Sequence, residues 1–519
     1  MRLETIELEE AHCFSSSFLD YINSNAKLKK FYNLDPTIDN FEEQLKNKHF
    51  SKHQRNVLHN VLLQQYDGLI ITSTTQANID SLTDENTFTV TTGHQLNIFT
   101  GPLYFIYKIV TTINTAKSLK AKYPTYNFVP VYWMASEDHD FEEISYFRLE
   151  GKKYQWDADQ KGAVGRFNPK SLKNILEALP GKTEIFQKAY LEHETLAEAV
   201  RYYVNALFEE QGLVIIDADN KELKGAFSKV MQEDIVNNGV KPIVDNTNDA
   251  LANEGYSSQV YARDINFFYL DGDIRSRIVK EENRYNVLDS SISFSEKEMM
   301  DLITNSPEKL SLNVILRPLY QEMILPNLAY IGGPSEVTYW LQLKDVFEKF
   351  NTSFPLLMPR NYGLIVDSNT NKKMNKINFG FKDWFLNVQD TIKLYVVNNT
   401  EQIISYNEEI EKLKLVYEQA NEVAHKIDPS LGQHLKALEV KATNLLSKAE
   451  KKLIRAEKKN HATKIKQIEA VKSLLFPNDN LQERTDNFLN FYNNNPHFID
   501  ELLKHFDPFN YKFHILIED

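Results

Sequence analysis

The alternation of apolar and polar positions predicts a parallel strand-helix-strand unit early in the chain. Residues 87–92 are rich in β-branched side chains and predict a strand. Gly101-Pro102 then marks the start of a helix expected at about 103–121, and the apolar run 128–135 predicts a second strand. Two strands joined in this way run parallel, with a right-handed crossover. We therefore expect the carboxyl ends of both strands to lie side by side.

The same alternation continues further along the chain. Strands are expected at 213–217, 265–270 and 354–358, between helical patterns at 196–210 and 337–350. Strands that alternate with helices indicate an α/β sheet. The expected fold class is therefore α/β.

Other regions are expected to surround this sheet. Residues 1–85 show helical spacing and predict an N-terminal helical layer, and about 145–310 is expected to hold inserted elements. Both belong to an expected catalytic core spanning 1–394. Residues 476–519 regain aromatic residues and prolines, so they are expected to return to the core.

Residues 395–475 have a different character, because glycine almost disappears while lysine and glutamate dominate. Apolar residues recur at the three-four spacing of a heptad seam. The seam breaks at 428–432, where Asp428 is expected to cap a helix and Pro429 to lie in its first turn. We expect two long helices folded into an antiparallel coiled-coil arm. The seam positions are 410, 413, 417, 420, 424 and 427 before the break, and 435, 438, 442, 445, 449, 453 and 456 after it.

The arm suits packing or dimerisation, and we expect the protein to be a homodimer. Binding of nucleic acid through the basic run 451–464 is the alternative. The net charge of −13 disfavours nucleic acid and anionic membranes as partners.

The composition of the chain restricts the classes of protein to which it can belong. The 519-residue chain is 42% hydrophobic and 25% charged, which is typical of a globular protein. We expect no signal peptide and no membrane span, because no stretch approaches the ~18 apolar residues that a span needs. A cytoplasmic location is therefore expected. The lone cysteine, Cys13, excludes internal disulfides and is not expected to act as a nucleophile.

The first turn of the strand-helix-strand unit is suited to anions. Gly93, His94 and Gln95 follow the first strand. Thr100 precedes the helix, whose free amide groups favour negative charge, and Lys108 on that helix is placed to reach back toward the turn. Ligands of open α/β sheets bind at this edge. We expect these residues to bind an anion.

The second turn combines three acids with a histidine, as Glu137, Asp138, His139 and Asp140. Such a group after a buried strand suits a general base, a magnesium site or a transition-metal site. A dedicated zinc site is disfavoured, because no His-Glu-x-x-His spacing occurs. The alternative is that the acids cap a helix starting near Phe141, although a cap uses one acid rather than three.

A second polar segment, 316–336, interrupts an apolar run. Arg317 is a candidate clamp for a carboxylate or phosphate, and Gly332-Gly333 would let a ligand approach the backbone. An ordinary turn with a surface arginine is the alternative. Arg360 and Arg484 are expected to add anion contacts. The chain has neither the Gly-x-x-x-x-Gly-Lys-Ser/Thr nor the Gly-x-Gly-x-x-Gly motif, which argues against a P-loop enzyme and a simple dehydrogenase.

Taken together, these motifs resemble those of the cysteine-adding enzyme of bacillithiol biosynthesis. The resemblance extends over residues 92–484 and departs at 476–480, where asparagines stand in place of a usual glycine and leave the loop shape open. The motifs are Thr92-Gly93-His94-Gln95, Thr100-Gly101-Pro102-Leu103-Tyr104, Tyr107-Lys108, Pro130-Val131-Tyr132-Trp133, Glu137-Asp138-His139-Asp140, Arg317-Pro318, Gln321-Glu322, Pro326-Asn327-Leu328-Ala329-Tyr330-Ile331-Gly332-Gly333-Pro334, Glu336, Trp340, Pro359-Arg360 and Leu481-Gln482-Glu483-Arg484.

The resemblance implies a Rossmann-like nucleotide-binding core with inserted connective elements, an antiparallel coiled-coil domain and a homodimer. It implies a ligase for the last step of bacillithiol synthesis, which forms an amide bond between the carboxyl of cysteine and the amine of glucosaminyl-malate. It also implies ATP or another nucleotide as the activating cofactor, with Mg²⁺ as a further candidate. The motif residues then expected to bind substrate include Tyr104, Gln321, Glu322, Asn327, Gly332, Gly333, Glu336 and Trp340.

Amide formation agrees with the two turns. An activated carboxyl needs an anion cradle, here His94, Gln95 and Lys108, and the amine needs a base, for which the acidic turn 137–140 is expected. Within this turn the choice among the three acids stays open. The two carboxylates of malate are expected to bind Arg317, Arg360 and Arg484.

Two other functions fit the same residues. A metal-dependent hydrolase acting on a sugar conjugate would use the acidic turn as its metal site. A scaffold protein would work through the coiled-coil arm. A stoichiometric metal whose removal abolishes activity would favour the hydrolase. A cellular role that survives replacement of Asp138 and His139 by alanine would favour the scaffold.

Overall fold

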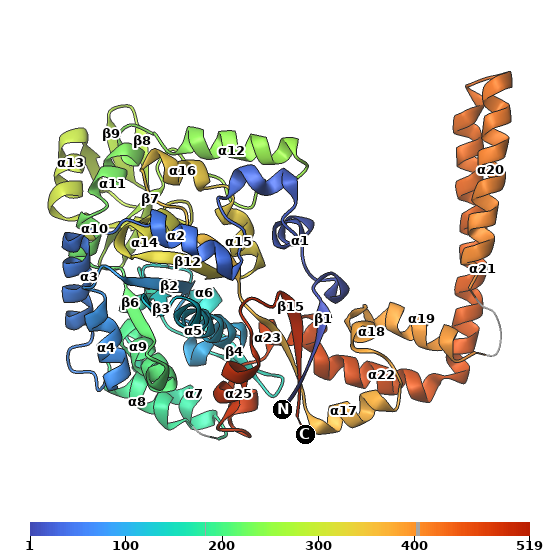
Figure 1. Ribbon diagram of the computed structural model, residues 1–519, viewed down its shortest axis with the longest axis horizontal. Helices are drawn as coiled ribbons and strands as arrows, with labels where there is room; N and C mark the ends of the chain where they lie inside the picture. The colour runs from blue at the N-terminus through green and yellow to red at the C-terminus, as the bar shows by residue number, and fades with distance from the viewer. Residues whose placement is uncertain (182, 401–404, 519) are drawn as a thin grey trace.

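The computed structural model describes residues 1–181, 183–400 and 405–518. Lys182 in the expected insertion, residues 401–404 in the expected arm segment and Asp519 at the end of the expected tail lie outside the described residues. The chain forms a large α/β body from which a pair of long helices projects (Figure 1). No helix within the described ranges is long and apolar enough to cross a membrane.

A five-stranded parallel sheet forms the centre of the body. Its strands are β2 Thr87–His94, β3 Asn127–Met134, β6 Val214–Asp217, β12 Asn327–Gly332 and β13 Leu356–Pro359. The chain builds the sheet outward from β2 through β3 to β6 and then adds β12 and β13 on the other side of β2. The winding direction therefore reverses between β2 and β12. Ligands of open α/β sheets bind beyond the carboxyl ends of the strands at such a switch point.

The predicted strand-helix-strand unit is confirmed, because α5 (Tyr104–Lys122) joins β2 to β3 and the two strands are parallel neighbours. Residues 128–134 are all buried, as expected of a strand covered on both faces. The polar side chains of β2 find partners inside the sheet: Thr89 and Thr91 donate to Oδ1 of Asn327 at 3.1 and 2.8 Å. The buried hydroxyl groups are thus satisfied.

The predicted insertion 145–310 contains a core strand as well as inserted elements. β6 lies within this range and pairs with β3, so the insertion is split into two parts. The first part begins with a hairpin of β4 (Tyr146–Leu149) and β5 (Lys152–Gln155). The second part forms an antiparallel sheet in the order β10-β9-β8-β7-β11, which includes the strand expected at 265–270. Its strands are β7 Phe267–Asp271, β8 Ile274–Glu281, β9 Arg284–Val287, β10 Ser293–Ser295 and β11 Leu310–Leu312.

Helices surround the central sheet (Figure 1). The predicted helical layer at 1–85 is present as four helices, and the helix predicted at 196–210 is α9. The segment 337–350, predicted as one helix, forms two helices, α15 and α16. The helices of the body besides α5 are α1 Ser16–Ile22, α2 Phe41–Asn47, α3 Lys52–Gln65, α4 Ser73–Ser81, α6 Phe141–Ile144, α7 Lys173–Ala178, α8 Glu184–Glu192, α9 Leu196–Phe208, α10 Lys221–Gly225, α11 Ser228–Ile235, α12 Lys241–Asn253, α13 Glu296–Asn305, α14 Arg317–Ile324, α15 Pro334–Trp340, α16 Lys344–Lys349, α17 Ser368–Asn375, α18 Phe381–Phe385, α19 Val388–Asn398, α23 Gln482–Thr485, α24 Leu489–Tyr492 and α25 Phe498–His505.

A third sheet joins the two ends of the chain. β15 (Lys512–Ile517) pairs with β14 (Tyr362–Val366) in parallel and with β1 (Arg2–Glu7) in antiparallel fashion. The N- and C-termini therefore lie close together (Figure 1). The chain begins with a strand rather than with the predicted helical layer, and its last residues pack on the body.

The arm consists of α20 (Asn407–Ile427) and α21 (Leu431–Asn460), which run antiparallel, and α22 (Ala462–Leu475) returns the chain to the body (Figure 1). Asp428 ends α20, and its Oδ1 accepts a hydrogen bond from the amide of Ser430 at 2.8 Å. The predicted antiparallel coiled coil is therefore confirmed, although the predicted seam positions 427, 445, 449, 453 and 456 are exposed. The α/β class is confirmed as well, with a Rossmann-like core and inserted elements.

Candidate active site

A cavity of about 330 Å³ lies at the switch point, beyond the carboxyl ends of β2 and β12. This switch-point cavity takes its walls from the two predicted turns, from α5 and from the polar segment that follows Leu316. Most residues predicted to bind substrate thus meet at one place. The lining residues are Gly93, His94, Gln95, Tyr104, Lys108, Trp133, Ala135, Asp138, Arg317, Pro318, Gln321, Tyr330, Gly333, Pro334, Ser335, Glu336, Tyr339, Trp340, Arg360 and Arg484.

His94 ends β2 and presents a neutral imidazole to the cavity. The centroid of its ring lies 5.4 Å from that of Tyr104 and 5.2 Å from that of Phe105. Its Nε2 atom is buried and has no hydrogen-bond partner among the described residues. Burial, and then the positive charges of Lys108 and Arg360, hold the pKa of His94 well below its ordinary value of 6.5. The ring is therefore uncharged at neutral pH and keeps one nitrogen for a ligand.

Lys108 ties the end of β2 to the end of β12. Its Nζ donates to the carbonyl of Gly93 at 2.7 Å and pairs with Oε2 of Glu336 at 2.5 Å. Glu336 also accepts from the amide of Gly333 at 2.8 Å and from the hydroxyl of Tyr330 at 2.6 Å. The ammonium does reach back to the first turn. However, its charge is already neutralised by Glu336, so an anion in the cavity gains less from it than the sequence suggested.

Asp138 is held by two arginines. Arg317 donates to both of its carboxylate oxygens, at 3.2 and 2.5 Å, and a terminal nitrogen of Arg275 lies 3.6 Å away. Burial disfavours the charged carboxylate, but the nearby charge of Arg317 outweighs burial and keeps the pKa of Asp138 below its usual range. Arg275 also lies 2.6 Å from Nδ1 of His139. His139 and Asp140 are exposed, and neither lines the cavity.

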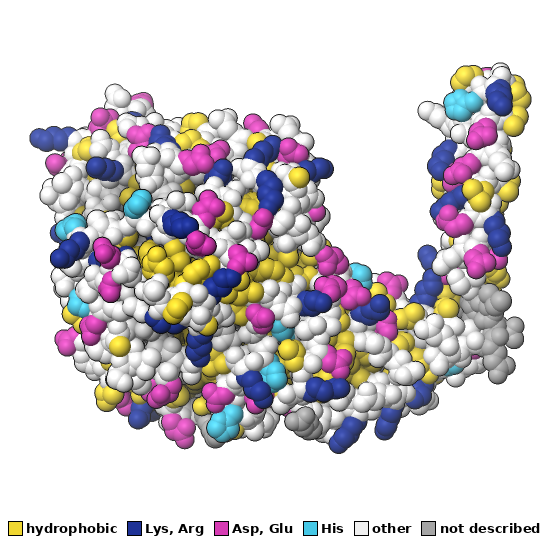
Figure 2. Space-filling view, viewed as in Figure 1, with side chains coloured by type: hydrophobic (Ala, Val, Ile, Leu, Met, Phe, Trp, Pro, Cys, Tyr) yellow, Lys and Arg dark blue, Asp and Glu magenta, His cyan; other side chains and the backbone are white. Residues whose placement is uncertain are grey.

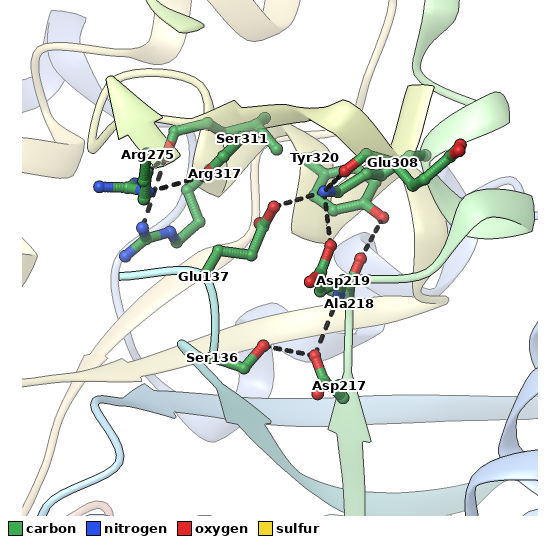
Figure 3. Close-up of polar contacts among 12 residues, drawn as sticks. Ser136, Glu137, Asp217, Ala218, Asp219, Arg275, Glu308, Ser311, Arg317 and Tyr320 are labelled. Atoms are coloured by element: carbon green, nitrogen blue, oxygen red, sulfur yellow. Dashed lines mark hydrogen bonds and ion pairs between the residues drawn. The ribbon is translucent and has the colours of Figure 1, made fainter. Parts of the chain in front are cut away.

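Glu137 does not line the cavity but joins a buried cluster of charges (Figure 3). Its carboxylate pairs with the ammonium of Lys224, which also pairs with Asp219 at 2.8 Å and donates to the carbonyl of Glu308 at 3.1 Å. Lys224 is fully buried, yet the two carboxylates outweigh burial and raise its pKa. Glu137 therefore lies apart from the cavity wall with its carboxylate paired to Lys224, and its role as a base stays a prediction.

The three arginines predicted to bind anions differ in their contacts. Arg317 is engaged by the acidic turn. Arg360 pairs with buried Glu483 at 2.5 Å, and its guanidinium lies 5.2 Å from the ring centroid of Tyr104. Arg484 is exposed, and its guanidinium makes no hydrogen bond or ion pair with any residue that the structure describes. Among these three, Arg484 alone keeps all its donors for a ligand.

Some residues predicted to bind substrate lie outside the cavity wall. Asn327 begins β12 and is therefore at the amino end of the strand, where its Nδ2 donates to Oε1 of Glu322 at 2.6 Å. Glu322 also pairs with buried Lys48 at 3.2 Å. Thr100 is buried in the turn before α5, and Gly332 lies one residue before the lining segment. Glu322 and Asn327 are thus bonded to each other away from the cavity wall, and their roles in substrate binding stay a prediction.

Several residues around the cavity were not predicted. Tyr330 and Tyr339 line its wall, Arg275 holds the acidic turn, and Lys224 anchors Glu137. A strand prediction at 327–332 would have pointed to Tyr330, because that strand ends at the cavity. No local pattern marks Arg275 or Lys224, since both come from regions whose position depends on tertiary packing.

Comparison with known proteins agrees with this architecture. Residues 1–361 match the family model for the N-terminal Rossmann-like domain of Bacillithiol biosynthesis BshC, and residues 363–518 match the model for its C-terminal coiled-coil domain. The BshC protein of Flavobacterium johnsoniae is 41% identical over 529 residues, which cover 99% of this chain and 100% of that protein. The BshC protein of Flavobacterium psychrophilum is 42% identical over 506 residues, and that of Chlorobaculum tepidum is 28% identical over 510 residues.

The coverage is high in each case. The match to the Flavobacterium psychrophilum protein spans 95% of both chains. The match to the Chlorobaculum tepidum protein spans 90% of this chain and 89% of that protein. All three relatives are named as cysteine ligases. The resemblance of the motifs is confirmed, and the chain belongs to the BshC family of bacillithiol biosynthesis.

Proposed function

We propose that this chain is a ligase that joins the carboxyl of cysteine to the amine of glucosaminyl-malate, as the last step of bacillithiol biosynthesis. The names of its relatives support a cysteine ligase rather than a hydrolase or a scaffold. One observation carries the proposal: His94, whose ring is uncharged and whose buried Nε2 has no partner among the described residues, lines a cavity at the switch point of the sheet. Amide formation needs such a base beside an activated carboxyl.

In the proposed reaction, the acceptor nitrogen attacks the acyl carbon of activated cysteine. A carbon–nitrogen bond forms, the bond between the acyl carbon and the activating group breaks, and the nitrogen loses a proton to the imidazole of His94. The side-chain amide of Gln95, in the same cavity wall, is suited to donate to the acyl oxygen as negative charge develops. The base is therefore assigned to the first turn, and not to the acidic turn as the sequence suggested.

Asp138 has a different role in this proposal. Because it is bonded to both terminal nitrogens of Arg317, it fixes the plane of that guanidinium in the cavity wall. A guanidinium carries five N–H groups, so Arg317 keeps donors for a substrate after binding Asp138. We infer that Asp138 orients Arg317 toward the substrates and does not accept the proton itself.

ATP or another nucleotide is the proposed activating cofactor. When bound, it would supply the leaving group on the cysteine carboxyl. The switch-point cavity fits its anionic part, because Gln95 and Ser335 in its wall offer neutral donors. Within the described ranges, no three His, Cys, Asp or Glu side chains are grouped to hold a metal. An accompanying Mg²⁺ ion would therefore depend on nucleotide oxygens for its ligands.

We further propose that two copies of the chain associate through the arm, in the cytoplasm. Apolar side chains remain exposed along the projecting helices, where Figure 2 shows them among charged ones. Ile427 is 75% exposed and Leu445 is 66% exposed. A repeated apolar face on a two-helix arm is typical of a surface that another helix covers.

Purified protein provides the test of the ligase activity. Incubation with cysteine, glucosaminyl-malate and ATP is expected to yield bacillithiol, which mass spectrometry detects. His94→Gln should lower kcat by about 10²-fold or more, because the base is lost. His53→Gln, which changes an exposed histidine outside the cavity, is the matched control. Failure to form product with any nucleoside triphosphate would contradict the proposal.

A further inference from the structure

A second cavity, of about 470 Å³, adjoins the switch-point cavity. The two cavities share Gln95, Tyr104 and Arg484 in their walls. This side cavity is bounded further by the hairpin strand β4 and by the loop that precedes α23. A ligand held in the side cavity therefore lies next to the reacting centre and separate from the space that His94 faces.

Two arginines without partners face the side cavity. Arg148, on β4, is half-buried, and Arg484, on α23, is exposed. Neither guanidinium makes a hydrogen bond or ion pair with any part of the chain that the structure describes. This sets them apart from Arg317 and Arg360, whose guanidinium groups are paired with acids. Unpaired cations that share a cavity wall attract anionic groups of a ligand.

The fold holds these two arginines in place relative to each other. The carbonyl of Arg148 accepts from the amide of Asn487 at 3.0 Å and from Nδ2 of Asn490 at 3.2 Å. Asn487 follows closely after Arg484, and its own Nδ2 donates to the carbonyls of Phe99 and Gly101 at 2.7 and 2.6 Å. Backbone contacts therefore fix both arginines, while their side chains stay free for a ligand.

The rest of the wall suits a polar ligand with hydroxyl groups. Asn478 and Asn480 contribute side-chain amides, and Glu143 contributes an exposed carboxylate. Asn478 and Asp479 have φ angles of 55° and 57°, in the left-handed region that glycine favours. Asparagine tolerates this conformation better than most residues.

We propose that the side cavity binds the dicarboxylate end of the acceptor, with Arg148 and Arg484 each pairing with one carboxylate. Two unpaired guanidinium groups favour a dianion, because each forms a bidentate contact with a carboxylate. The assignment rests on the proposed ligase function, since malate is the dicarboxylate of that acceptor. The sugar extends past the shared wall of Gln95 and Tyr104, and its amine reaches His94.

Calorimetric titration of the full-length protein with L-malate tests this site directly. Arg148→Met and Arg484→Met are each expected to weaken malate binding about tenfold or more, and the double variant to abolish it, because a charge-assisted contact is lost at each step. Arg263→Met, which removes an exposed arginine outside the cavity, should bind malate like the unmodified protein. The melting temperatures of all variants should agree, since neither guanidinium has a partner in the fold.

The enzymatic counterpart compares two acceptors. The double variant should raise KM for glucosaminyl-malate while KM for cysteine is unchanged, and it should lose the preference for glucosaminyl-malate over a methyl glucosaminide that lacks malate. If malate binding depends on both arginines but no amide product forms, the proposed malate site stands and the ligase function is refuted. Product formation with unchanged malate binding and KM in the variants would overturn the site. Tighter binding of inorganic phosphate than of malate would overturn it as well.

Discussion

The two terminal nitrogens of Arg317 donate to the two carboxylate oxygens of Asp138, at 3.2 and 2.5 Å. The contact joins the turn after β3 to the start of α14, on the wall of the switch-point cavity. A carboxylate bound in this way stays ionised below its usual pH range. It is therefore better suited to orienting a cation than to accepting a proton at neutral pH.

Asp138→Asn is predicted to lower kcat/KM by about 10- to 100-fold, because a charge-assisted pair is broken. The loss in the double variant Asp138→Asn/Arg317→Met should scarcely exceed that of Arg317→Met alone, since the two residues act as a unit. Steady-state kinetics of the three variants measures this coupling. Asp140→Asn, an exposed neighbour, is the control. Losses that simply add would show that Asp138 acts independently of Arg317.

The neutral state of His94 predicts the pH profile. A base is active when unprotonated, so kcat at saturating substrate concentrations should stay level as pH falls to 6.5 and should decline only below that value. Removal of the Lys108 charge, together with its partner in Lys108→Met/Glu336→Gln, should raise the pKa of His94 and move this decline to higher pH. An acid limb near neutrality in the unmodified enzyme, or one that does not move in the variant, would refute His94 as the base.

Lys224 is predicted to be essential for stability. Lys224→Met leaves buried Glu137 without its ion-pair partner and Asp219 with Arg166 alone, and should lower the free energy of unfolding by about 3–5 kcal/mol. The double variant Lys224→Met/Glu137→Gln should recover much of this loss, because Glu137 is then uncharged and Asp219 keeps its ion pair with Arg166. Urea denaturation followed by circular dichroism provides the measurement. Lys221→Met, on the exposed side of the same helix, should leave stability within about 0.5 kcal/mol of the original.

The arm should control association. If its exposed apolar residues form the dimer contact, Ile427→Glu and Leu445→Glu each place a charge in that contact and should yield monomers. Light scattering at several protein concentrations gives the mass directly. Asn444→Glu adds a charge at an exposed polar position of α21, the helix that carries Leu445, and is expected to leave the dimer intact. A monomeric unmodified protein would disprove the proposed assembly.

Sequence patterns were sufficient to predict the elements whose boundaries are marked by nearby residues. The unit β2-α5-β3 was predicted because β-branched runs and the Gly101-Pro102 pair mark its boundaries, and the arm because its heptads repeat over many turns. β12 was missed, since Gly332-Gly333 suggested a turn although the residues before it form a buried strand. β1 was missed because its partner, β15, lies at the other end of the sequence.

The location of the candidate site could be predicted from the sequence, but the roles of its individual residues could not. Parallel strands bring His94 and the acidic turn to one edge, so topology alone was sufficient to place them together. Glu137 and Asp138 are adjacent in sequence, yet one is buried against Lys224 and the other faces the cavity. Arg148 carried no sequence signal, because its importance depends on a cavity formed with a segment from the far end of the chain.

The pairing of β1 with β15 also constrains how the protein is made. Among the described strands β1 pairs only with β15, so this sheet cannot close until the whole segment between the two strands has been synthesised. Closing so long a loop carries a large entropic cost, and this step is expected to be slow relative to formation of the local helices. Because β1 and β15 are neighbours, a circularly permuted variant is also expected to fold. Such a variant would have a short linker between these two strands and new ends in an exposed loop.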